Sequence, residues 1–106
     1  MSVFYDHLVG LDEIHNELLN FNLPTRKHYH LLQIVGSTLH HEVLNVILLE
    51  IPQEAHERFL VEFHNRPADP AHLEFLRQYS PEIEDKISST ANGVKSRILG
   101  EIRKSK

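Results

Sequence analysis

Histidine is the residue type whose abundance first suggests chemistry in this chain. Two histidine ligands on one helix must lie three or four residues apart to project from the same face. No two histidines have that spacing, and the metalloprotease pattern HExxH is absent. The only acid–histidine neighbours on one helical face are Asp12 with His15 and Asp69 with His72. The nine histidines stand at positions 7, 15, 28, 30, 40, 41, 56, 64 and 72 of the 106.

We therefore interpret the histidines as structural or solvated side chains, and leave open a site assembled from different helices. His40 is a separate case because it falls within the apolar arc of its helix. A buried histidine usually stays neutral and bonds to a backbone group or a hydroxyl. We expect the same of His40, in preference to a ligand or catalytic role.

The other residues that carry out catalysis are absent or lack their usual context. The chain has no cysteine, which excludes thiolate catalysis and disulfides, and it has no GxSxG motif. Four isolated glycines form no phosphate-binding loop, and the paired acids stand near helix beginnings, where the helix dipole favours them. The sequence thus predicts no enzyme, no catalytic, cofactor-binding or metal-binding residues, and no cofactor.

The charge balance argues against a nucleic-acid partner. Eleven Lys and Arg stand against 15 Asp and Glu, a net charge of −4. Residues 94–106 carry five basic residues and one acid. We interpret this basic end as complementing the helix dipole and aiding solubility, in preference to a contact with nucleic acid or with an acidic partner.

No membrane partner is expected either. The longest apolar run, Val46 to Leu49, is far shorter than the ~20 residues of a membrane span. The amino terminus lacks the basic flank and the apolar stretch of a secretion signal. We therefore expect a cytoplasmic protein.

The elements are marked by prolines, which stand at the edges of helical patterns. The last helix carries a stripe of Ile83, Ile87, Ala91, Val94, Ile98 and Ile102, and an earlier one places Phe59, Leu60 and Phe63 inward. Because no stretch alternates apolar and polar residues, the predicted class is all-α, a compact bundle of four to five helices. A short strand over 47–51 is the alternative, but one strand forms no sheet. The expected helices cover about 6–20 (which Gly10 can divide), 26–50, 53–64, 70–79 and from 81 onward.

The second half of the long central helix is apolar around more than half of its circumference. Its polar strip is narrow, consisting of His41, Glu42 and Asn45. Burial at the centre of the monomer and a self-association surface explain this pattern equally well. The residues that form the candidate interaction surface are Leu44, Leu48 and Leu49.

The order of these signals resembles a short all-helical bacterial domain family of unknown function. The resemblance rests on Leu23-Pro24, on the central helix that closes at Ile51-Pro52, and on Phe75-Leu76 followed by Pro81. It covers residues 23–102, after an N-terminal helix within 1–22. It implies an all-helical fold and no particular chemistry, and the histidines are not part of the pattern.

Together these observations predict a single helical domain over 1–106. We expect it to act through protein contact, chiefly as a homodimer, with no nucleic acid and no membrane as partner. The alternative is a metal- or small-ligand-binding domain that uses histidines gathered across helices.

Overall fold

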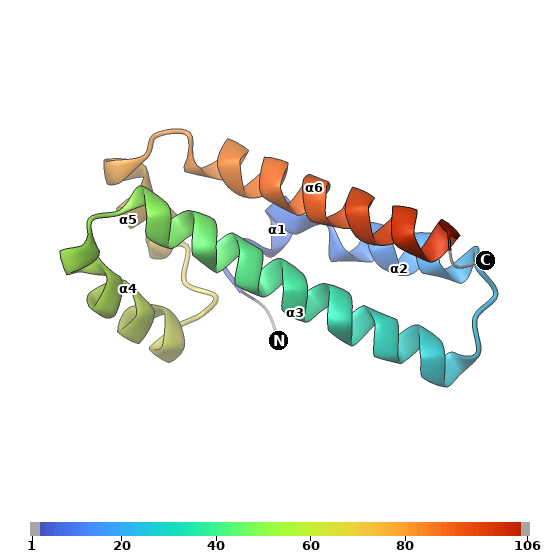
Figure 1. The fold of residues 1–106 in the computed structure, drawn as a ribbon. Helices are drawn as coiled ribbons and strands as arrows, with labels where there is room; N and C mark the ends of the chain where they lie inside the picture. Colours follow the sequence, from blue (N-terminus) through green and yellow to red (C-terminus); the bar gives the residue numbers. More distant parts are fainter. Residues whose placement is uncertain (1–2, 105–106) are drawn as a thin grey trace.

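Two long antiparallel helices, α3 and α6, form the backbone of the fold (Figure 1). The computed structural model describes residues 3–104, apart from the side chain of residue 11. No strand occurs within this range, so the predicted all-α class is confirmed, and residues 47–50 are helical. The helices are α1 (Asp6–Val9), α2 (Leu11–Leu19), α3 (Thr25–Glu50), α4 (Gln53–Asn65), α5 (Ala71–Tyr79) and α6 (Ile83–Lys104).

The six helices of the described range outnumber the predicted four to five. The difference arises at Gly10, which adopts φ +60° and so ends α1 and separates it from α2. A left-handed residue cannot continue a right-handed helix, and glycine adopts this conformation without steric cost. Gly36 and Gly93, by contrast, lie inside unbroken helices.

The core forms where the apolar faces of the helices meet, each made of side chains three or four residues apart. Val35, Leu39, Val43 and Ile47 follow one another at four-residue steps along α3, and each is buried. The predicted stripe of α6 is buried from Ile83 to Val94, while Ile98 and Ile102 pack against the core from its edge. In α4 the prediction was right for the two phenylalanines and wrong for Leu60, which is 39 % exposed.

The segment before α1 packs against the turn between α4 and α5, which lies far away in the sequence. Phe4 donates its backbone N–H to the carbonyl of Pro67 at 2.8 Å, and its ring meets Phe63 edge-on with centroids 5.6 Å apart. Pro67 lies in the turn between α4 and α5. The N-terminal segment therefore fixes the α4–α5 end against the rest of the molecule.

The molecule is elongated, with principal extents of 45 × 23 × 19 Å and a radius of gyration of 15.2 Å. A typical domain of this length has a radius of gyration of about 13 Å. The accessible surface, 7051 Å², also exceeds the roughly 6,100 Å² expected for a monomer of this mass. More side-chain surface therefore stays exposed than in an average domain of this size.

Helix α3 is long and apolar enough to cross a membrane, judged by length and composition alone. No membrane-spanning segment was expected from the sequence, because the longest uninterrupted apolar run, at 46–49, is short. The mean hydropathy of an 18-residue window can nevertheless be high when polar residues are interspersed among apolar ones. This finding is weak evidence for a membrane span, because the core helices of soluble proteins meet the same criterion.

Replacing Gly10 by alanine should lower the free energy of unfolding by about 1 kcal/mol, because an L-residue strains the left-handed conformation. The new Cβ would also lie 2.9 Å from Nζ of Lys95 and displace it. The matched control is Gly93→Ala, where no atom lies within 4 Å of the added Cβ. Since Gly93 is inside a helix, this control should stabilise the protein by about 0.5–1 kcal/mol. Urea unfolding measures both, and equal effects in the two variants would contradict the assignment of Gly10.

Candidate functional site

The three residues of the predicted interaction surface do not share one open face. Leu44 and Leu48 are half-buried and pack against the core, whereas Leu49 is 77 % exposed. At 100° per residue, Leu49 points about 140° away from Leu44 around α3. Leu49 is therefore the member of this set that remains free for contact with another molecule.

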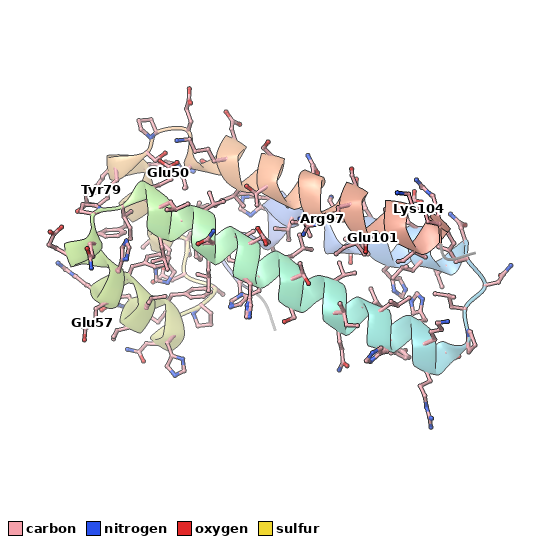
Figure 2. The ribbon with its side chains drawn as sticks, viewed as in Figure 1. Glu50, Glu57, Tyr79, Arg97, Glu101 and Lys104 are labelled. Carbon is pink, nitrogen blue, oxygen red and sulfur yellow. The ribbon has the colours of Figure 1, made fainter. Side chains whose placement is uncertain are left out.

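A shallow groove of about 370 Å³ between α3 and α6 contains Leu49. Val46 and Leu49 supply its apolar lining from α3, and Ser89 and Thr90 supply polar atoms from α6. At one end Lys86 donates to Glu50 at 2.7 Å, where the end of α3 passes the beginning of α6 (Figure 2). The groove thus has an apolar centre and a polar rim, the arrangement found in protein interfaces.

A second apolar surface lies on the outer side of α4. Leu60 and Val61 are 39 % and 52 % exposed and line a shallow groove of about 490 Å³ with His56, His64 and others. This helix packs its phenylalanines inward, so its outer side is left without a covering element. A substitution on this side of α4 can therefore serve as a control for a substitution in the groove at Leu49.

His40 is half-buried and forms a hydrogen-bonded pair with the buried Tyr5, the kind of hydroxyl partner that was expected for it. The Tyr5 hydroxyl lies 2.7 Å from Nδ1 of His40, and Tyr5 is only 3 % exposed. The ring of Phe63 stacks on the imidazole with centroids 6.0 Å apart. The pair satisfies two polar groups inside an aromatic cluster, so its role is structural.

Burial controls the ionisation of both partners. Desolvation, reinforced by the charge of Asp6, raises the pKa of Tyr5 to about 12. Desolvation, and secondly the nearby His41, lower the pKa of His40 below its ordinary value of 6.5. At neutral pH both groups are uncharged, and the hydroxyl donates to Nδ1 when the ring carries its proton on Nε2.

A second histidine pair joins α2 to α3. Nε2 of His28 lies 3.1 Å from Nδ1 of His15, and the two rings meet edge to face with centroids 4.9 Å apart. His28 is 7 % exposed, whereas His15 lies at the surface. The imidazole of His15 thus bonds to a residue of another helix and not to Asp12, the acid on its own helical face.

The remaining buried histidine, His72, serves the turn between α4 and α5. Its Nε2 bonds to the carbonyl oxygen of Arg66 at 2.6 Å, and Asp69 instead accepts the backbone N–H of Ala71 at 2.9 Å. Asp69 thereby satisfies one of the backbone donors that the first turn of α5 leaves without a partner inside the helix. His72 and Arg58 also line a cavity of about 300 Å³ between α4 and α5.

The basic end of α6 is partly neutralised within the chain. Lys95 is buried and lies 3.1 Å from a carboxylate oxygen of Glu13, while Arg103 lies 3.7 Å from Glu17. Both acids belong to α2, which lies beside α6 (Figure 1). Lys106 of the predicted basic segment lies outside the described residues. Lys95 and Arg103 of the basic segment thus form ion pairs within the chain.

Within the described part of the chain, no group of three or more His, Cys, Asp or Glu side chains is arranged to hold a metal ion. Comparison of the chain with protein-family models, with curated proteins and with solved structures finds no match. The resemblance to a bacterial helical family therefore stays a prediction, and the evidence on function comes from the geometry of this chain.

Replacing His40 by glutamine should destabilise the protein in a pH-dependent manner. The lowered pKa means that the folded state binds this proton less readily than the unfolded state does. The stabilisation by neutral His40 is therefore complete above pH 6.5 and declines as the pH falls through the lowered pKa. The loss of the bond to Tyr5 should cost about 1–2 kcal/mol at pH 7.5.

Thermal unfolding of the wild type and of His40→Gln at several pH values tests this expectation. The difference in Tm between them should shrink from pH 7.5 to pH 5, whereas His30→Gln, at an exposed position of the same helix, should match the wild type throughout. A constant difference would show that His40 does not owe its role to being neutral.

Proposed function

We propose that this chain is a non-enzymatic helical interaction domain whose chief partner is a second copy of itself. The observation that carries the proposal is the 77 % exposure of Leu49 in an apolar groove on the most apolar helix. A leucine that exposed contributes little to the folded monomer, whereas contact with a partner would remove its surface from water.

The chemistry of the groove suits a second copy. In a dimer with two-fold symmetry the same patch meets itself, so Leu49 of each copy can pack on Val46 of the other. The rim carries the hydroxyls of Ser89 and Thr90, the ion pair of Lys86 with Glu50, and the exposed carboxylate of Asp85. Asp85 stays solvated if it remains at the edge of the contact, while the apolar side chains Val46 and Leu49 form its centre. A self-complementary apolar patch is therefore a sufficient explanation of the groove.

The shape of the chain supports the same conclusion. Its accessible surface of 7051 Å² exceeds the roughly 6,100 Å² of a typical monomer by an area similar to what one partner buries in a standard interface, about 800 Å². Association along the long axis would bring the exposed surface to that of an ordinary globular protein.

We also propose that the domain is cytoplasmic and binds neither membrane nor nucleic acid. The exposed side of α3 carries Gln33, Ser37, His41 and Asn45, whose polar groups would lack partners in lipid. The net charge of −4 and the pairing of Lys95 and Arg103 with acids disfavour a polyphosphate ligand.

A second candidate function is metal or small-ligand binding by histidines from different helices. One observation favours it, the direct contact of His15 with His28 across α2 and α3. This contact lies among the residues that line another small cavity, at the turn between the two helices.

The decisive variant for self-association is Leu49→Glu. It places a carboxylate into the proposed apolar contact, so the dimer should dissociate while the helical circular dichroism and Tm of the monomer are kept. Light scattering at about 100 μM, a concentration that populates even weak dimers, measures the mass. A wild type that is monomeric under these conditions would overturn the proposal.

Two control variants locate the contact. Val61→Glu places the same charge on the exposed side of α4 and should leave the dimer intact. Leu48→Glu introduces the charge where the side chain packs against the core, so it should lower the free energy of unfolding by about 2 kcal/mol or more. Dissociation by Val61→Glu and not by Leu49→Glu would move the interface to α4.

A further inference from the structure

The contact between His15 and His28 joins one exposed and one buried imidazole. His28 lies in the first turn of α3, is buried, and donates its backbone N–H to Pro24 at 2.9 Å. His15 contacts it from the surface of α2. Figure 1 shows the turn that joins α2 to α3 at one end of the molecule. One imidazole is thus buried, and the other contacts it from the surface.

The distance between the two nitrogens matches the separation of two ligands on one metal ion. With metal–nitrogen bonds of about 2.05 Å, two imidazole nitrogens lie about 2.9 Å apart at a right angle and about 3.3 Å apart at the tetrahedral angle. The observed distance of 3.1 Å falls between these values. In the observed contact the hydrogen lies between the two nitrogens, so metal binding requires both rings to tilt until their lone pairs meet at a point beside the contact.

The surroundings leave room for the rest of a coordination sphere. A cavity of about 330 Å³ adjoins both histidines and is also lined by Asn22, Thr25 and Tyr29. Because the described residues provide no third histidine or carboxylate here, water would occupy the remaining positions. The site would therefore exchange its metal readily and keep open positions for another ligand.

We propose that His15 and His28 bind a divalent first-row transition metal, with Cu²⁺ bound most tightly. Imidazole nitrogens suit copper, nickel and zinc, and copper stands highest in the general order of affinity. In the neutral pair one ring donates its only N–H to the other ring, so metal binding requires that this ring move its proton to its outer nitrogen. Nδ1 of His15 and Nε2 of His28 then both present a lone pair to the ion, and each ring carries its one proton on the other nitrogen. This site specifies the second candidate function and does not depend on self-association.

Titration of the tag-free chain with Cu²⁺ at pH 7.5, followed by calorimetry and electron paramagnetic resonance, tests the proposal. The wild type should bind one ion most tightly, with a spectrum of nitrogen ligation. His15→Gln is the decisive variant because His15 is exposed and its loss should leave the fold intact. Its affinity for Cu²⁺ should fall at least about tenfold, since even the loss of an outer-sphere partner costs 10–100-fold.

His30→Gln is the matched control, because it removes an exposed histidine from the same turn region of α3. It should keep the affinity and the spectrum of the wild type. Equal affinity in wild type and His15→Gln would overturn the proposal, as would an equal loss in His30→Gln. Light scattering of the metal-free protein reports on the dimer independently, so the failure of one proposal is distinguishable from the failure of the other.

Discussion

The packing of α6 along α3 is the contact on which the remaining structure depends. It is the most extensive contact between two helices of the described chain. It buries the apolar face of α3, which consists of Val35, Leu39, Val43 and Ile47 at intervals of four residues. A stripe of β-branched and leucine side chains on one helix meets isoleucines and Ala91 on the other, which allows a close approach over many turns. Once these two helices are aligned, α1 and α2 cover one side of the pair, and α4 and α5 close one end.

Helical periodicity and proline positions were sufficient to predict the class of the fold and most helix boundaries. Thr25–Glu50 and Ala71–Tyr79 differ from the expected ranges by one residue, because proline and apolar spacing act locally. The helix count was wrong because the presence of a glycine does not reveal its φ angle. The apolar periodicity is continuous over residues 6–20, whereas the left-handed Gly10 divides this segment into α1 and α2. Leu60 was misplaced because periodicity gives the width of an apolar arc but not the helix that covers it.

The partners of the buried polar side chains could not be predicted from the sequence, because they lie in other parts of the chain. The sequence predicted a hydroxyl or backbone partner for His40, and the structure identifies Tyr5, which is 35 positions away. No spacing rule could find His15 with His28, or Glu13 with Lys95, because each contact joins different helices. Their common signal is physical: a histidine or lysine within an apolar stripe needs a partner from elsewhere in the chain. Arg58, beside the cavity between α4 and α5, gave no such signal because it is exposed.

The pairing of α1 and α2 with α6 has a consequence for the order in which the chain becomes stable during synthesis. The ion pair between Glu13 and Lys95 spans 82 positions, and the bond between Phe4 and Pro67 spans most of the chain as well. Contacts of such long separation form late, because the intervening chain must first be ordered. A ribosome that has released residues 1–80 has therefore delivered α3 without the helix that covers its apolar stripe. Until Ile83–Lys104 emerges, that stripe is a surface that chaperones can bind and that other unfinished chains can reach.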